Sequence, residues 1–107
     1  MDEELIIHTD SYEFDDRIYS PAVLVYFYDH RDNNCRGFEY VIEEVARHYE
    51  ETLTVLAVDI EQSPDIAYRY LVENLPFVIM FRDGEPIGDL EGANLLEVYF
   101  DLIEAFI

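Results

Sequence analysis

The sequence predicts an α/β domain built on one central mixed sheet that carries helices on both faces. Three observations support this prediction. Residues 22–28, 53–60 and 77–81 are apolar runs without alternation, which is typical of strands buried on both faces. Segments with helical periodicity or helix-start signals separate these runs, as in sheets with crossover helices. An Asp-Gly turn signal at residues 83–84 predicts an antiparallel hairpin that closes the sheet.

The first part of the chain predicts two strands and two helices. Residues 5–8 form a short strand, and a helix within residues 11–19 takes Ser11 as its N-cap. After the strand at residues 22–28, a long amphipathic helix follows. Its apolar residues recur at three- and four-residue spacing: Phe38, Val41, Ile42, Val45, Ala46 and Tyr49. This stripe predicts that the helix covers one face of the sheet.

The next segment predicts a strand, a helix and a further strand. Residues 53–60 form the strand. Ser63 as N-cap and Pro64 at the first helical position then predict a helix over residues 63–72. The apolar run at residues 77–81 forms the strand that enters the hairpin.

The hairpin leads to an edge strand and a last helix. Residues 86–90 return as the second strand of the hairpin, and Pro86 marks this strand as an edge. Asn94 and Glu97 match a capping-box pattern at the start of the last helix. The predicted order is therefore β-α-β-α-β-α-β-β-α within a single domain, residues 1–107.

The composition narrows the classes of partner. The chain of 107 residues has 25 acidic side chains against six arginines and no lysine, for a net charge of −19. Bare nucleic acid and anionic membranes would be repelled, so a basic partner or a salty environment is favoured. No apolar stretch approaches the roughly 20 residues of a membrane helix, and the acidic N-terminus lacks a secretory signal pattern. One cysteine fits a reducing compartment, so we expect a cytoplasmic protein.

The order and lengths of these elements resemble the thioredoxin family over nearly the whole chain. "VLVYFYDHRDNNCRG", residues 23–37, resembles the strand that runs into that family's W-C-G-P-C-K active site. "DIEQSP", "NLPF" and "FRDG" resemble the D/N-x-x-x-P, x-I-P-T and F-x-x-G marks, and "EGA", residues 91–93, resembles the loop that completes the substrate groove. The resemblance implies a thioredoxin-like fold in which Pro76 is cis and faces the active site.

The active-site positions depart from the family pattern. The family uses two thiols, one to attack a substrate disulfide and one to resolve the mixed disulfide. The resemblance places Asp32 at the first position, Asn33 and Asn34 between, and Cys35 at the second. Asp32 can cap the helix for roughly 1 kcal/mol, but a carboxylate cannot attack a disulfide. Its charge also disfavours a neighbouring thiolate, so we expect Cys35 to be weakly reactive.

Five further positions differ from the family at the same time. Tyr26 stands where the family often has a buried aspartate, and Ala57 stands where its partner lysine would lie. Arg31 and Tyr28 replace two tryptophans, and Tyr40 replaces the proline that kinks the long helix. The set indicates a thioredoxin-like fold released from dithiol chemistry.

The same loop offers four potential metal ligands, namely Asp29, His30, Asp32 and Cys35. Their spacing matches no closed zinc pattern, and the sequence holds no second Cys/His pair. We therefore predict neither a metal site nor a cofactor.

Three hypotheses for the function are compatible with these observations. The leading hypothesis is a peptide-binding or chaperone-like module, whose partner is a basic protein or an extended peptide. Its groove residues are Arg31, Leu75, Pro76, Glu91, Gly92 and Ala93. The alternative is a thiol–disulfide oxidoreductase that works through the single thiol of Cys35, so the sequence leaves open whether the protein is an enzyme. In the third hypothesis, the acidity itself is the function, as a nucleic-acid mimic or an adaptation to salt.

Overall fold

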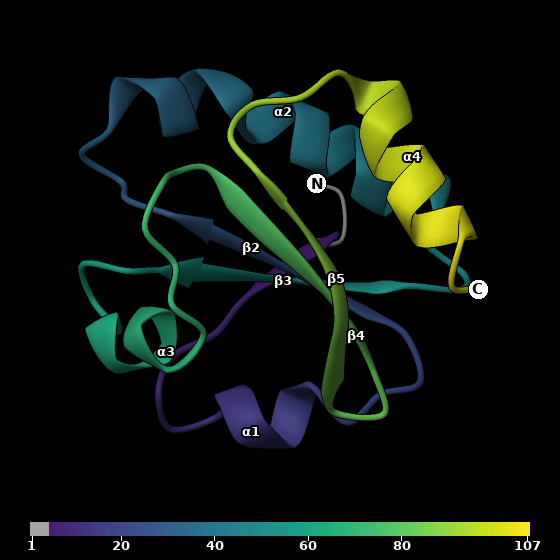
Figure 1. The fold of residues 1–107 in the computed structure, drawn as a ribbon, viewed down its shortest axis with the longest axis horizontal. Helices are drawn as coiled ribbons and strands as arrows, with labels where there is room; N and C mark the ends of the chain where they lie inside the picture. Colours follow the sequence, from purple (N-terminus) through teal and green to yellow (C-terminus); the bar gives the residue numbers. More distant parts are fainter. Residues whose placement is uncertain (1–4) are drawn as a thin grey trace.

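A computed structural model describes residues 5–107 of the chain (Figure 1). Residues 1–4, the start of the acidic N-terminus and of the predicted domain, lie outside the described residues. The elements are β1 (Ile6–His8), α1 (Phe14–Arg17), β2 (Val23–Tyr28), α2 (Asn33–His48), β3 (Thr54–Asp59), α3 (Pro64–Arg69), β4 (Phe77–Arg82), β5 (Glu85–Glu91) and α4 (Leu96–Glu104). This order confirms the predicted succession of strands and helices.

The five strands form one mixed sheet in the order β1-β3-β2-β4-β5. β1 and β2 both run parallel to β3, whereas β4 is antiparallel to β2 and β5 is antiparallel to β4. β5 is an edge strand, and Pro86 lies there beside a register shift opposite Met80 and Phe81. The hairpin and the edge position of Pro86 are as predicted, because proline cannot donate to a second neighbour.

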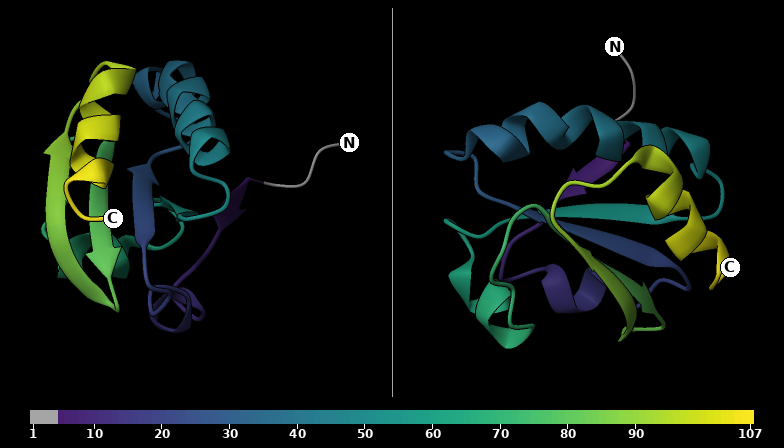
Figure 2. Two further views of the ribbon diagram at one scale, coloured as in Figure 1. Left: turned by 90° about the vertical axis from the view of Figure 1, so that its right-hand side faces the viewer. Right: turned by 45° about the horizontal axis from the view of Figure 1, so that its top comes forward.

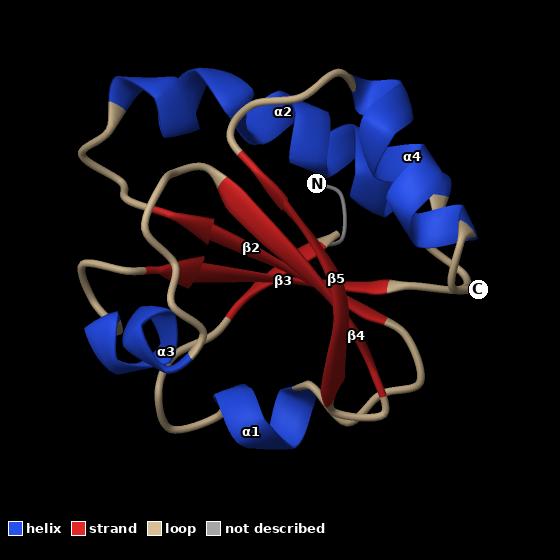
Figure 3. Cartoon of the chain, viewed as in Figure 1, coloured by secondary structure: helices blue, strands red, loops and turns tan. Residues whose placement is uncertain are grey.

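Helices cover both faces of the sheet, as Figure 3 shows and the two views of Figure 2 confirm from other directions. α2 and α4 lie on one face, and α1 and α3 lie on the other. The core beneath α2 and α4 contains Leu24, Tyr26, Phe38, Ile42, Val45, Val78, Met80, Tyr99 and Ile103. The core beneath α1 and α3 contains Phe14, Val25, Phe27, Leu56, Val58, Ile66 and Phe81. Each central strand thus buries both of its faces, which explains the continuous apolar runs. Within residues 5–107, no helix is long and apolar enough to span a membrane.

The start of α1 differs from the prediction. The helix begins at Phe14, and the carboxylate of Asp10 accepts hydrogen bonds from the backbone N–H groups of Tyr12 and Glu13, at 3.0 and 3.1 Å. The hydroxyl of Ser11 instead donates to the carboxylate of Asp65. Ser11 is therefore not the N-cap: Glu13 occupies that position without a side-chain cap, and Asp10 holds the turn that leads into α1.

The start of α4 also differs from the prediction. Leu95 occupies the N-cap position and α4 begins at Leu96, with no side-chain cap. The amide of Asn94 donates backwards, to the carbonyl oxygens of Glu91 and Gly92 at 3.4 and 3.0 Å. Because Leu95 and not Asn94 occupies the N-cap position, the predicted capping box does not form.

Candidate functional site

The candidate site lies at the turn between β2 and α2, where Asp32 starts the long helix. Its Oδ1 atom accepts hydrogen bonds from the backbone N–H groups of Asn34 at 2.8 Å and Cys35 at 3.4 Å. These two amides belong to the unpaired donors at every helix N-terminus. The structure confirms the predicted cap, and it places a carboxylate where the helix dipole favours an anion.

Cys35 lies in the first turn of α2, and its exposed fraction is 1%. Burial is the largest cause that raises the pKa of its thiol above the usual value. The carboxylates of Asp32, Asp29 and Asp59 raise this pKa further, while a hydrogen bond with the Asp29 backbone opposes them. The thiol is therefore mostly protonated at neutral pH.

A tyrosine pair lies beneath this turn. Tyr26 is 2% exposed, and its hydroxyl donates to the backbone carbonyl of Cys35 at 3.2 Å. Its ring stacks on Tyr28 with centroids 5.3 Å apart and contacts Phe38 at 6.3 Å. Burial, together with the charges of Cys35 and Glu39, raises the pKa of Tyr26 far above its usual range. The buried position therefore holds a neutral phenol that fixes the helix start.

A cleft of about 260 Å³ opens beside the first turn of α2. Its lining residues are Asn34, Gly37, Phe38, Leu75, Pro76 and Ala93. The Leu75–Pro76 peptide bond is cis. Four of the sequence-predicted site residues thus lie together, namely Asn34, Leu75, Pro76 and Ala93. Sequence reasoning missed Gly37 and Phe38 as cleft residues, because Phe38 also belongs to the apolar stripe of the helix.

Gly92 and Glu91 shape the loop that faces this cleft. The N–H of Gly92 donates to the carbonyl of Pro76 at 2.8 Å, and Gly92 has a φ of +81°, which side-chain-bearing residues rarely adopt. The carbonyl of Gly92 accepts from the hydroxyl of Tyr99 at 3.2 Å. The exposed carboxylate of Glu91 accepts a hydrogen bond from the Asn74 side chain. Both residues position the cleft wall and do not line the cavity.

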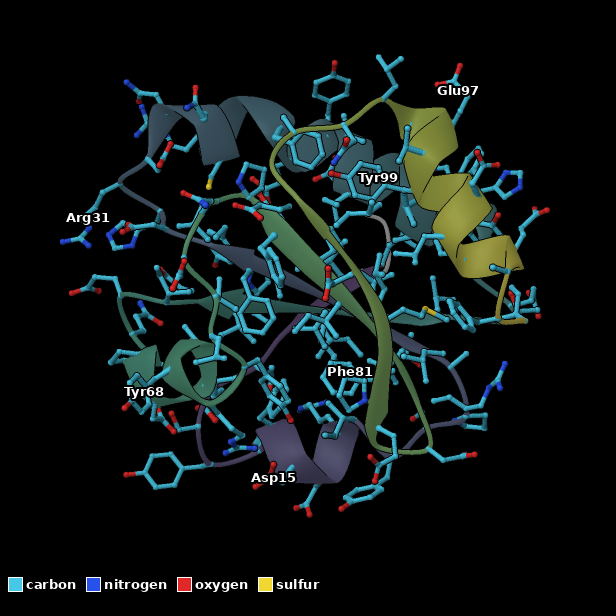
Figure 4. The ribbon with its side chains drawn as sticks, viewed as in Figure 1. Asp15, Arg31, Tyr68, Phe81, Glu97 and Tyr99 are labelled. Atoms are coloured by element: carbon cyan, nitrogen blue, oxygen red, sulfur yellow. The ribbon has the colours of Figure 1, made fainter. Side chains whose placement is uncertain are left out.

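Arg31 lies outside the cleft and points into solvent in Figure 4. Its guanidinium forms a fork with Asp29, with Nε to Oδ1 at 2.9 Å and Nη2 to Oδ2 at 2.7 Å. These hydrogen bonds hold the pKa of the Asp29 carboxyl well below its usual range. The pair fixes the loop before α2 and leaves the predicted groove without the Arg31 charge.

One group of possible metal ligands exists near the site in the described part of the chain. The ligand atoms of Asp29, His30 and Asp59 lie within 4.8 Å of one another. Side chains of this same chain already contact all three residues. The Arg31 guanidinium donates to Asp29, and Nδ1 of His30 lies 2.7 Å from Oδ2 of Asp59. Asp32 and Cys35, which the sequence suggested as possible ligands, are not members of this group.

The fold and the site define an α/β protein whose cleft joins a strand-to-helix turn to a cis-proline loop. The sequence profile of the thioredoxin family matches residues 5–105. Thioredoxin from Staphylococcus saprophyticus is 34% identical over 96 residues, which cover 90% of this chain and 91% of that protein. Thioredoxin from Staphylococcus epidermidis is 36% identical over 94 residues, with 84% and 89% covered.

A solved structure agrees with these sequence relatives. A mutant thioredoxin from Halobacterium salinarum NRC-1 superposes with a TM-score of 0.84 at 28% identity, covering 94% of this chain and 89% of that one. The chain belongs to the thioredoxin family, and its fold is the thioredoxin fold.

Proposed function

We propose that this protein performs thiol–disulfide exchange of the thioredoxin type through the single thiol of Cys35, as a dithiol-lacking member of its family. The observation that carries the proposal is the position of Cys35. It lies in the first turn of α2, one residue after a residue that lines the cleft at cis-Pro76. The relatives named thioredoxin favour this redox role over the chaperone-like role that the sequence put first. With one unpaired cysteine, we also place the protein in the reducing cytoplasm.

The reaction needs a second thiol from outside the chain. The Cys35 thiol loses its proton, and the thiolate attacks one sulfur of a partner disulfide. The S–S bond breaks, a mixed disulfide forms, and the other sulfur leaves as a thiolate that takes up a proton. A low-molecular-weight thiol then attacks the partner sulfur of the mixed disulfide and releases Cys35. In the net reaction, one partner sulfur exchanges its original disulfide bond for a disulfide bond to the low-molecular-weight thiol, with no net oxidation.

The geometry makes this exchange slow. Cys35 is covered, so a disulfide reaches its sulfur only when the first turn of α2 or the cleft wall opens. The raised pKa of the thiol also keeps the thiolate fraction small at neutral pH. We therefore expect turnover far below that of a two-thiol protein, and a rate that increases with pH.

A second candidate function is peptide binding without exchange. It is favoured by Asp32, which holds the nucleophile position as a helix cap and has no redox chemistry. An extended segment would lie in the cleft and form backbone hydrogen bonds beside Pro76. The net charge of −19 and the exposed carboxylate of Glu91 favour a basic partner.

Turnover of a small disulfide, with glutathione as the external thiol, separates the two candidates. We expect the wild-type protein to exceed the uncatalysed rate and the Cys35→Ser and Cys35→Ala variants to fall to it. Cys35→Ala controls for the polar hydroxyl that serine buries, and circular dichroism checks both folds. Mass spectrometry of the wild-type protein should also show a mixed disulfide between Cys35 and one half of the small disulfide. Equal rates in all three proteins would refute exchange and leave peptide binding as the function.

A further inference from the structure

We propose that a pocket between α2 and the start of α4, here called the α2–α4 pocket, takes one large apolar side chain of a partner segment that carries basic residues beside it. The pocket encloses about 620 Å³, within the range of about 300–1,000 Å³ of ligand-binding pockets. Its lining includes Phe38, Tyr40, Val41, Leu95, Leu96 and Glu97. The inference rests on the proposed function, because it describes the kind of partner segment that would reach the cleft beside Cys35.

The α2–α4 pocket has a buried base and an exposed apolar rim. Phe38 is 6% exposed and packs against the ring of Tyr99, with centroids 5.6 Å apart. Tyr40 and Leu95 are 71% and 73% exposed. Single exposed apolar residues are common on protein surfaces, but two of them at the rim of a large apolar pocket indicate a contact surface.

Leu95 provides an independent observation. It occupies the N-cap position of α4, where leucine is strongly disfavoured against serine, threonine, aspartate or asparagine. Its side chain makes no cap hydrogen bond and is largely exposed. Neither helix capping nor core packing explains a leucine here, whereas contact with an apolar partner side chain does.

The α2–α4 pocket adjoins the cleft at cis-Pro76. Phe38 and Ala93 line both cavities. An extended segment that lies beside Pro76 can therefore place a side chain in the pocket without leaving the surface. One extended segment can therefore contact both cavities at once.

The negative charge at the rim of the α2–α4 pocket favours basic residues beside the apolar side chain of the partner. Glu44 and Glu97 both line the α2–α4 pocket. Glu44 pairs with Arg47 at 3.0 Å, whereas Glu97 makes no ion pair with any of residues 5–107 and points outward in Figure 4. Within a chain of net charge −19, this rim attracts arginine or lysine and repels acidic segments.

The probe is a short fluorescent peptide without cysteine that has one phenylalanine between pairs of arginines, and binding is measured by anisotropy at low salt. We expect Leu95→Ser and Tyr40→Ser each to weaken binding about tenfold, which corresponds to about 1.4 kcal/mol. Tyr68→Ser is the matched control, because Tyr68 is 82% exposed on α3 at the opposite face (Figure 4) and should bind as wild type. Glu97→Gln should weaken binding about threefold and reduce its salt dependence, whereas the exposed Glu51→Gln control should leave both unchanged.

The outcomes separate this inference from the exchange function. The inference would be overturned by any of three results. The wild-type protein does not bind the peptide, the Leu95 and Tyr40 variants bind it as tightly as wild type, or a peptide with glutamates in place of arginines binds equally well. Amide chemical-shift changes confined to Asn34 and Leu75 would also overturn it. The same titration on Cys35→Ser should be unchanged. Binding without disulfide turnover therefore refutes exchange alone, and turnover without binding refutes the α2–α4 pocket alone.

Discussion

Replacing Asp32 tests whether one carboxylate both stabilises α2 and suppresses the thiol of Cys35. Its Oδ1 atom accepts two backbone hydrogen bonds, at 2.8 and 3.4 Å, so Asp32→Ala removes the side-chain cap of the helix. Loss of an N-cap costs about 1 kcal/mol, and loss of the charge near the helix dipole adds about 0.3–1 kcal/mol. We expect a free energy of unfolding lower by about 1–2 kcal/mol, and a Tm lower by about 4–8 °C per kcal/mol.

Asp32→Asn separates the cap from the charge, because asparagine caps as well as aspartate. We expect Asp32→Asn to lose only the charge contribution, about 0.3–1 kcal/mol, in urea and thermal unfolding. Both variants remove a carboxylate that raises the pKa of Cys35, so both should be alkylated by iodoacetamide faster than wild type at pH 8. If Asp32→Asn loses as much stability as Asp32→Ala, the hydrogen bonds are not the cause. Unchanged alkylation in both variants would show that Asp32 does not suppress the thiol.

Four further tests concern the pH dependence of stability, the β4–β5 turn, the net charge and the turn before α2. Burial raises the pKa of Cys35, and burial with a hydrogen bond to a carboxylate raises the pKa of Tyr49 to about 12. The stabilisation from these two groups is complete below their ordinary pKa values of 9.0 and 10.0 and is lost as pH rises through the folded-state values, so the urea midpoint should fall as the solution becomes alkaline. Gly84→Ala should destabilise by more than about 1 kcal/mol in urea unfolding, because φ is +87° and the added Cβ would lie 2.5 Å from the Tyr19 ring. Adding salt to about 1 M should raise the Tm through screening of the net charge of −19, and a Tm independent of salt would argue against an adaptation to salt. Asp32→Cys should form an intramolecular disulfide with Cys35 on oxidation and gain insulin-reducing activity. Failure to form that disulfide, checked by mass spectrometry, would contradict the proposal that Asp32 and Cys35 occupy the two thiol positions of the family.

The sequence predicts the sheet and its helices well because both signals are local. Buried strands need unbroken apolar runs, and the helix α2 needs an apolar stripe. Residues 22–28 and 38–49 show these patterns, so a strand and a helix are predicted there from the local sequence alone. Helix starts are predicted less well. Ser11 and Asn94 are good capping residues, but Asp10 takes the amides of the turn that leads into α1, and Asn94 bonds to the loop behind it. Competition between polar groups within two residues is decided by geometry that a pattern does not contain.

The candidate site is predictable only in part, because its walls come from distant segments. Asp32 as a cap follows from the local sequence, whereas the approach of Pro76 and Ala93 to α2 follows only from the family resemblance. The helical stripe identifies Phe38 as a core residue, and its second role at two cavities appears only when the loop before α4 lies beside it. The predicted capping box at Asn94 likewise places Leu95 at the first position of the last helix. The helix begins one residue later, and Leu95 is exposed.

The electrostatics of the site connect thiol reactivity with the choice of partner. Three carboxylates, those of Asp32, Asp29 and Asp59, raise the pKa of Cys35 in addition to burial. If the proposed basic segment binds beside Pro76, its positive charge would lie near these carboxylates and would offset part of their effect, which would lower the pKa of the thiol. Binding of an acidic segment would have the opposite effect. Burial remains the larger cause of the low reactivity of the thiol, so under the proposed function a basic partner would relieve only the part that the carboxylates add. Exchange and the binding of a basic segment would then depend on the same carboxylates.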